Sequence, residues 1–367
     1  MISSQKQDGG DGSTNLQAMQ MVVNLGIDEK RAREICQEMH LQLKNDYTQE
    51  ALKIANARVN AFEDRLFPKI EKVEGALGAF ADPSFQLLLA EAHKRAASTE
   101  RSEDYDLLSE LLIYRFQIGQ NRNVRAGISH AVEIVDQVSD EALVGLTASH
   151  AIQRFTPSTG DINIGLDVFN NLFGKIIYRD LPTGNDWLDH LDILNAVRLS
   201  AFGNLKKIHQ LYPEKLSGYV DVGIDKKSDD YKKAVEIIFK NDLPNDILID
   251  HSLNTDFVRV KVTTKEKINE IYLKYQVLHE GSLLNYDKVN LSDDQIKAIE
   301  SIYDLYSQDG NLKQSNIDKF MVDKRQNLKT LREWWDSLTT GFNITAVGKV
   351  LAHSNAQRCD KNLPAFN

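Results

Sequence analysis

Residues 48–74, TQEALKIANARVNAFEDRLFPKIEKVE, carry the strongest periodic pattern in this chain. Apolar residues recur there at spacings of three and four: Leu52, Ala55, Val59, Phe62, Leu66, Ile70 and Val73. Residues at these spacings share one face of an α-helix, so the stretch predicts an amphipathic helix roughly 40 Å long. The charged residues between them are expected to face water: Glu63, Asp64, Lys69, Glu71 and Lys72. Because so long an apolar stripe cannot bury itself, other helices must pack along it.

The surrounding sequence predicts those partner helices. Asp28, with Glu29 behind it, is a suitable first residue for a helix that runs to about residue 45. Asp82-Pro83 combines an N-cap with a proline at the first helical position, and Ser139 caps a helix that extends to about residue 154. Short links between such helices favour antiparallel packing. Residues 27–156 therefore read as a compact helical-bundle domain.

The rest of the chain is predicted to be a second α-rich region with a few short strands. Helix-period patterns occupy residues 161–180, 187–211, 265–279, 293–306, 314–323, 328–337 and 346–357. Strands are expected at residues 257–262 and 342–345, whereas residues 217–254 mix apolar and charged residues and predict no definite element. The fold class is therefore mainly α. The expected organisation is an arm over residues 1–26, then domains over 27–156, 157–290 and 291–367.

The N-terminal arm is polar and glycine-rich up to residue 14 and then becomes apolar. Residues 16–23 have no helical stripe, which favours an extended segment with no second strand nearby to pair with it. A lone strand leaves its backbone polar groups without partners, so it can pair between chains. We place the candidate interface residues at Leu16, Ala18, Met21 and Val23. A loosely ordered arm is an equal alternative.

Composition limits the classes of function. The chain has 367 residues and a net charge of −9, which argues against broad affinity for nucleic acid or anionic membranes. Cys36 and Cys359 have no framework spacing, which suits a reducing compartment. The sequence shows no signal-peptide pattern and no run of 18 apolar residues, so a cytoplasmic location without a membrane span is expected.

No catalytic, cofactor or metal motif is recognisable. Gly174-Lys175 and Gly348-Lys349 lack the upstream glycine and the hydroxyl residue of a phosphate-binding loop. His190, His251 and His279 have no second ligand at a metal-binding spacing. We therefore expect no catalytic residue, cofactor or metal ligand. An enzyme remains an alternative if distant residues converge, as His150 and Arg154 could from one helix face.

Two features near the C-terminus suggest contacts. Trp334 and Trp335 are adjacent in a predicted helix and point about 100° apart, so one could lie at a subunit contact. A two-sided core within the chain is the alternative. Lys349, His353 and Arg358 lie along the last helix and could bind a phosphate of nucleic acid, although a solvated helix face is favoured.

Both ends of the chain resemble known sequences. The opening Gly10-Asp11-Gly12-Ser13-Thr14-Asn15-Leu16-Gln17-Ala18 is similar to the GDxSTNxQA-type openings of bacterial proteins. Residues 328–358, with Trp334-Trp335 and NITAVGKVLAHSN, resemble the end of a family of uncharacterised helical cytosolic bacterial proteins. Proteins with such openings occur beside antiviral-defence genes. The resemblance implies a defence association and transfers no catalytic residue.

These observations predict a non-enzymatic interaction, scaffold or sensor protein of the bacterial cytoplasm. We expect it to form a homo-oligomer through its N-terminal strand and to bind a protein partner, with no membrane contact. A nucleic-acid-binding regulator that uses the C-terminal strand and helix is the first alternative. An enzyme whose site is invisible in sequence is the second.

Overall fold

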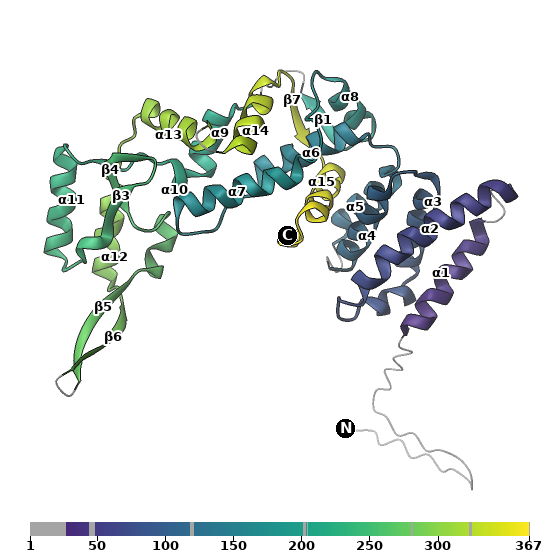
Figure 1. Ribbon diagram of the computed structural model, residues 1–367, viewed down its shortest axis with the longest axis horizontal. Helices are drawn as coiled ribbons and strands as arrows, with labels where there is room; N and C mark the ends of the chain where they lie inside the picture. The colour runs from purple at the N-terminus through teal and green to yellow at the C-terminus, as the bar shows by residue number, and fades with distance from the viewer. Residues whose placement is uncertain are drawn as a thin grey trace, which may run out of the picture.

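The computed structural model describes residues 27–43, 48–117, 121–200, 203, 205–279, 282–322 and 325–366. The candidate interface residues Leu16, Ala18, Met21 and Val23 lie outside these ranges. The molecule is elongated and mainly helical, with short antiparallel strands (Figure 1). Two separate hydrophobic cores divide it. We call residues 27–220 and 310–366 the large lobe, and residues 224–306 the small lobe.

The large lobe begins with the predicted helical bundle. Its elements are α1 (Glu29–Leu43), α2 (Gln49–Ile70), η1 (Ala76–Ala81), α3 (Pro83–Ser98), α4 (Ser102–Gln117), α5 (Arg122–Ile134) and α6 (Asp140–Arg154). The predicted caps are present: the side chains of Asp28, Asp82 and Ser139 accept backbone N–H groups at the starts of α1, α3 and α6. Thr48 caps α2 in the same way. The buried residues of α2 follow the apolar stripe, which confirms the helix that the sequence predicts around Phe62.

The large lobe continues beyond the boundary predicted at residue 156. Its further elements are α7 (Ile162–Ile176), α8 (Asp186–Ile193), β1 (Val197–Ser200), α9 (Ile208–Lys215), α10 (Ser217–Val220), α13 (Gly310–Val322), α14 (Gln326–Ser337), β7 (Gly341–Ile344) and α15 (Ala346–Cys359). Helix α15 packs against α4, α5 and α6, so the end of the chain completes the core of its beginning. The helix predicted over residues 187–211 is wrong. Strand β1 interrupts it and pairs antiparallel with β7.

The small lobe is one continuous segment. It contains β2 (Ile224–Asp225), α11 (Asp229–Lys240), η2 (Asn245–Ile247), β3 (Leu248–His251), β4 (Asn254–Val260), η3 (Lys265–Glu270), β5 (Tyr272–His279), β6 (Ser282–Asn290) and α12 (Asp293–Tyr303). The sheet order is β2-β4-β3, and β5 and β6 form a separate hairpin that extends from the lobe (Figure 1). The helix predicted over residues 265–279 is wrong, because that segment forms η3 and then β5.

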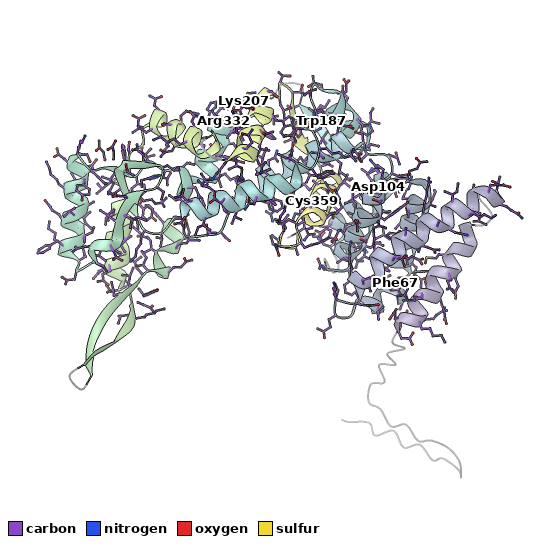
Figure 2. The ribbon with its side chains drawn as sticks, in the orientation of Figure 1. Phe67, Asp104, Trp187, Lys207, Arg332 and Cys359 are labelled. Carbon is purple, nitrogen blue, oxygen red and sulfur yellow. The ribbon has the colours of Figure 1, made fainter. Side chains whose placement is uncertain are left out.

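Trp334 and Trp335 lie inside the large lobe. The indole N–H of Trp334 donates to the carbonyl of Pro182 at 2.7 Å, and that of Trp335 donates to the carbonyl of Lys206 at 2.9 Å. Trp187, on α8 (Figure 2), packs against Trp334, and the ring centroids are 5.9 Å apart. Both tryptophans are buried within one chain, so they form a two-sided core and do not present a subunit contact.

The last helix is also more buried than its polar sequence predicts. His353 and Asn355 of α15 are buried, which corrects the expectation of a solvated helix face. Asn355 donates to Thr147 Oγ1 on α6 at 2.8 Å and accepts from Arg358 at 2.8 Å. These hydrogen bonds replace water at the polar positions and allow a polar helix to occupy a core.

Candidate functional site

The chain passes between the two lobes twice, and the two connections lie side by side. The outgoing connection runs from Val220 to Ile224, and the return follows Tyr306. The backbone N–H of Ser307 donates to the carbonyl of Gly223 at 2.8 Å, which ties the two connections together. Any group bound at this point therefore contacts the only covalent links between the lobes.

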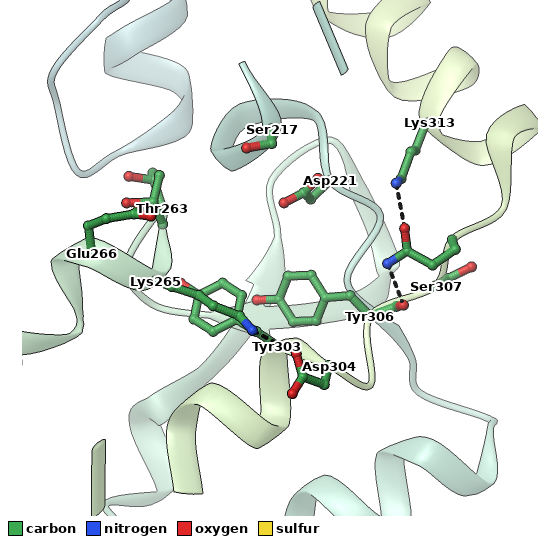
Figure 3. Close-up of a pocket in the computed structure, with 12 residues that line it drawn as sticks. Ser217, Asp221, Thr263, Lys265, Glu266, Tyr303, Asp304, Tyr306, Ser307 and Lys313 are labelled. Carbon is green, nitrogen blue, oxygen red and sulfur yellow. Dashed lines mark hydrogen bonds and ion pairs between the residues drawn. The ribbon is translucent and has the colours of Figure 1, made fainter. Parts of the chain in front are cut away.

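A polar cavity of about 430 Å³ opens at this junction (Figure 3). Both lobes line it: Ser217, Asp221 and Lys313 lie on or next to elements of the large lobe, and η3 and the end of α12 provide the other side. Its volume falls within the range of small-molecule sites, which occur preferentially where domains meet. The junction is therefore our candidate functional site, and we call this cavity the junction pocket.

Asp221 is the central ionisable group of the junction pocket. Its backbone carbonyl accepts from His251 Nε2 at 2.6 Å and from Asn316 Nδ2 at 3.3 Å, so one residue from each lobe fixes its position. Partial burial raises the pKa of Asp221 to about 6, while the charges of Lys313 and Arg259 act in the opposite direction. The carboxyl group therefore changes protonation state close to neutral pH. Perturbed groups of this kind cluster at functional sites.

Arg259 is a buried cation behind the pocket. Its guanidinium donates to three backbone carbonyls, those of Val260 at 3.2 Å, Gly218 at 2.7 Å and Val262 at 3.0 Å. Because Gly218 belongs to α10 of the large lobe, this side chain also bridges the two lobes. Three carbonyl partners satisfy a charge that would otherwise be costly to bury.

Two tyrosines form the aromatic wall of the junction pocket, with ring centroids 4.9 Å apart. Tyr303 donates its hydroxyl proton to the carbonyl of Val262 at 2.8 Å, and the hydroxyl oxygen of Tyr306 accepts from Val260 N at 2.7 Å. Burial raises the pKa of Tyr306 to about 12 and raises the pKa of Tyr303 as well. Both phenols therefore stay protonated at neutral pH, and the pocket combines aromatic faces with one titrating carboxyl group.

The junction pocket has the composition of a binding site. Its hydroxyl, amide and carboxyl groups can orient a small polar ligand against the tyrosine rings. Among the residues that line it, no histidine or cysteine is present to form a nucleophile and base pair. Sequence reasoning missed this site, because its residues come from separate segments and none belongs to a motif.

His150, Arg154 and His353 lie close together in the structure. This meets one requirement of the enzyme alternative, which is that residues from distant segments converge. His150 Nε2 lies 3.4 Å from His353 Nδ1, and His353 Nε2 lies 3.0 Å from the carbonyl oxygen of Pro364. Arg154 and His353 line a cavity of about 360 Å³ beside α7. Burial lowers the pKa of His150 to about 3, and the charges that lower it further are cationic: His353, Arg154, Lys215 and Lys349. Proton transfer at neutral pH would need an acidic partner, and among the described residues the charges named here are all cationic.

The candidate nucleic-acid residues do not form a common surface. Lys349 is exposed, whereas His353 is buried in the core. The Arg358 guanidinium lies 4.9 Å from the centroid of the Tyr178 ring and donates to Asn355. The positions of these residues therefore give little support to nucleic-acid binding through α15, which stays a prediction.

The comparisons with known proteins identify the family. A family model matches residues 26–364, so the chain belongs to that family, which is uncharacterised. None of the curated proteins and none of the solved structures matches the chain. Within the described residues, the structure has no helix with the length and apolar character needed to cross a membrane.

Proposed function

We propose that this member of the family is a non-enzymatic sensor or scaffold protein of the bacterial cytoplasm. A small polar ligand in the junction pocket would set the arrangement of the two lobes and so control how the protein contacts its partners. One observation carries the proposal: both connections between the lobes border the pocket, around a carboxyl group whose pKa is about 6. Antiviral defence stays a prediction that rests on sequence resemblance alone.

The contacts across the junction support a hinge. They include the bond from Arg259 to Gly218, a bond of 3.0 Å from Lys267 Nζ to the carbonyl of Ser158, and one of 3.1 Å from Lys319 Nζ to the carbonyl of Leu253. Each lobe has its own core, and Leu253 of the small lobe also packs against the core of the large lobe. Polar interfaces between domains permit relative motion more readily than large apolar ones. A ligand that contacts both sides could therefore select one arrangement.

The hairpin of β5 and β6 supports a role in partner binding. It forms a two-stranded sheet, so each strand has an outer edge with no strand neighbour in the described part of the chain. Isolated hairpins are marginally stable, and an open edge can accept a strand from a partner. The partner-binding surface would then lie on the lobe whose orientation the junction pocket controls.

The sensor proposal is tested by a ligand screen on the full chain. Nucleosides, nucleotides, amino acids and sugars are screened for an increase in melting temperature, and each hit is followed by small-angle X-ray scattering. We expect a hit to change the radius of gyration and to lose its effect in Asp221→Asn. The matched control is Asp246→Asn, an exposed carboxylate of the small lobe that pairs with Lys261 at 3.4 Å. A screen without a hit, or hits that bind equally to Asp221→Asn, would contradict the proposal.

Assembly through the N-terminal segment is a separate part of the proposal and rests on the sequence pattern of residues 16–23. Light scattering on a sizing column gives the absolute mass of the full chain and of a chain that starts at Gly26. We expect an oligomer that loses subunits on truncation. Equal masses for the two chains would remove the strand-assembly idea and leave the sensor proposal intact.

A further inference from the structure

Three possible metal ligands meet between the first three helices. Cys36 lies on α1, Glu63 on α2 and His93 on α3, and one ligand atom from each lies within 4.8 Å of the other two. His93 Nε2 and Glu63 Oε1 are 2.9 Å apart. The sequence pattern places Glu63 on the water-facing side of α2, but its side chain is only 16% exposed and turns toward α3. The cluster is therefore a feature that only the folded chain reveals.

The cluster is largely buried among apolar side chains, and the charge of Arg33 also acts on Cys36. Cys36 has no exposed surface, His93 is 1% exposed, and the ring of Phe62 packs edge-on against His93 with centroids 5.6 Å apart. Glu63 is the one member with appreciable exposure, so solvent can reach the cluster from its side. A thiol, an imidazole and a carboxyl group that meet in a core can be held together by a shared ion or by hydrogen bonds among themselves.

We propose that Cys36, Glu63 and His93 bind a divalent ion of the zinc class. Sulfur, nitrogen and oxygen donors together are a set that zinc uses, whereas magnesium and calcium require oxygen ligands. The three ligand atoms lie within 4.8 Å of one another, so small side-chain adjustments would bring all three to bonding distance of one ion. Three protein ligands leave the fourth position for a water molecule, which would enter from the Glu63 side.

The site also has a satisfied state without metal, and this state is the alternative to test. Glu63 then receives hydrogen bonds from His93 and from the Cys36 thiol. Burial, followed by the nearby Glu63 charge, raises the pKa of the Cys36 thiol. Zinc binding would displace the thiol proton to solvent and convert these hydrogen bonds into metal bonds. The ion would then fasten α1 to α2 and α3.

The inference does not depend on the sensor proposal, because the cluster and the junction pocket lie in different parts of the molecule. It adds a possible control over the N-terminal end of the described chain. Besides this cluster, α1 contacts the bundle mainly through η1 and α3. A metal ion would therefore fix α1, the first helix of the described chain.

Cobalt(II) provides the test, because a thiolate bound to cobalt gives a charge-transfer absorption band in the near ultraviolet. The full chain is treated with chelator, dialysed and titrated with Co²⁺. We expect one Co²⁺ per chain with this band, and displacement of the band by Zn²⁺. In Cys36→Ser the band should disappear. The matched control is Cys359→Ser, which removes the chain's other cysteine, on α15, far from α1 (Figure 2).

Two further variants keep the result interpretable. Glu63→Gln preserves the side-chain shape and should weaken Co²⁺ binding at least tenfold, as should His93→Gln, while far-ultraviolet circular dichroism confirms that each variant is folded. Wild-type protein with native circular dichroism and no cobalt band would show that the trio is only hydrogen-bonded and would overturn the inference. A band that persists in Cys36→Ser, or that is lost in Cys359→Ser alone, would also overturn it.

Discussion

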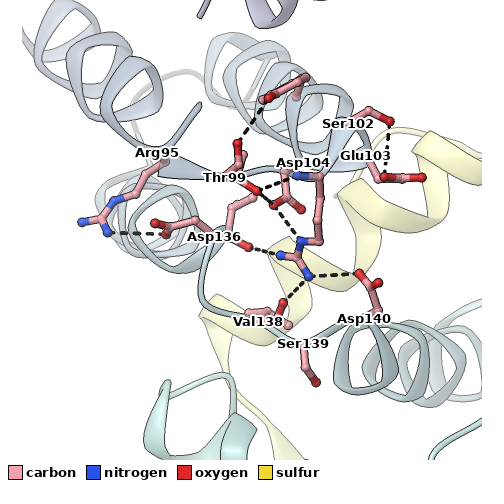
Figure 4. Close-up of polar contacts among 12 residues, drawn as sticks. Arg95, Thr99, Ser102, Glu103, Asp104, Asp136, Val138, Ser139 and Asp140 are labelled. Carbon is pink, nitrogen blue, oxygen red and sulfur yellow. Dashed lines mark hydrogen bonds and ion pairs between the residues drawn. The ribbon is translucent and has the colours of Figure 1, made fainter. Parts of the chain in front are cut away.

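Arg101 shows how one side chain can hold several helices together. It lies between α3 and α4 and donates to the carbonyls of Val135 at 2.9 Å and Val138 at 2.6 Å, and to the carboxylates of Asp104 and Asp140, each at 3.0 Å. Figure 4 labels Asp104, Val138 and Asp140 of this group. The start of α4 is thereby fastened to the turn between α5 and α6. Burial raises the pKa of Asp104, and the Thr99 hydrogen bond and Arg101 act against that effect.

Replacing this hub should be costly. Arg101→Met removes the guanidinium that donates to these four partners. It leaves the carboxylate of Asp104, which is 2% exposed, without the cation of Arg101. We expect a loss of about 3 kcal/mol in the free energy of unfolding, measured by urea denaturation. Arg95→Met is the matched control, because the Arg95 guanidinium pairs with Glu91 and Asp136 among the described residues and its loss should cost about 1 kcal/mol. Equal losses in the two variants would refute a hub role for Arg101.

Asp221 predicts an unusual dependence of stability on pH. Its pKa is raised from 3.8 to about 6 in the folded chain, so the folded state binds the proton more tightly than the unfolded state. Its stabilising contribution is therefore complete below about pH 4 and is lost as the pH rises through 6. Asp221→Asn mimics the protonated form. Its free energy of unfolding at pH 7.5 should therefore exceed that of the wild type by about 3 kcal/mol.

Urea denaturation at several pH values checks this expectation. The advantage of Asp221→Asn over the wild type should be full at pH 7.5 and nearly absent at pH 4. Asp246→Asn, whose side chain is 73% exposed, should change the free energy of unfolding by less than about 0.5 kcal/mol. A lower stability of Asp221→Asn at pH 7.5 would show that the ionised carboxylate is a structural partner.

At the scale of elements, the start of α15 fits so closely against Ala196, the residue before β1, that one methyl group should separate them. A Cβ at Gly348 would overlap the carbonyl oxygen of Ala196. That carbonyl also accepts the backbone N–H of Thr345 at 3.0 Å, so it is not free to move away. Gly348→Ala should therefore lower the free energy of unfolding by about 3 kcal/mol, because overpacking forces backbone shifts.

A second glycine provides the control for helix propensity. Gly127 on α5 faces the same helix, but a Cβ there would lie 3.5 Å from the carbonyl oxygen of Ala346, which is ordinary contact. Gly127→Ala should gain up to about 1 kcal/mol because alanine favours a helix. Thermal and urea denaturation of the two variants separate these effects. A stabilised Gly348→Ala would mean that β1 and α15 can move apart without cost.

The elements that the sequence predicts well are those with local signals. An N-cap such as Asp82 and an apolar stripe such as that around Phe62 depend on residues within one or two helical turns, and both are confirmed. Strand β1 is different, because its partner β7 comes from the other end of the large lobe. A four-residue strand without a local partner has no recognisable sequence pattern. The helical pattern of the adjacent α8 was therefore extended over β1.

The candidate site was beyond sequence reasoning for the same reason. Asp221 lies in a segment with no clear period, and Tyr303 and Tyr306 read as part of an ordinary helix. Only folding brings them around one cavity. Cys36, Glu63 and His93 likewise come from three helices, so no ligand spacing appears in the sequence. The sequence predicts the helix at 346–357 correctly but does not predict its burial. Its polar residues indicate a solvated face, and the hydrogen bonds to α6 that allow their burial cannot be read from the sequence.

At the scale of the whole molecule, the small lobe is an insertion into the large one. Its core comes from a continuous segment, and the hydrogen bond from Ser307 to Gly223 holds its two ends together. The sequence predicts boundaries at residues 156 and 290 instead. The first boundary divides the core of the large lobe, and the second divides the core of the small lobe. Continuous segments with their own core and adjacent ends commonly fold alone.

Fragments of the chain test this division. A fragment of residues 222–308 should show a cooperative thermal transition by circular dichroism, and the chain with residues 224–306 replaced by a short Gly-Ser linker should keep the helical content of the large lobe. The sequence-based domain of residues 27–156 is the informative comparison. It lacks α15, so it exposes the apolar surfaces of α4, α5 and α6 that this helix covers, and it should melt without cooperativity. If residues 27–156 fold cooperatively and residues 222–308 do not, then the lobes depend on each other, and a pocket at their junction would be part of a rigid core that no ligand could use as a hinge.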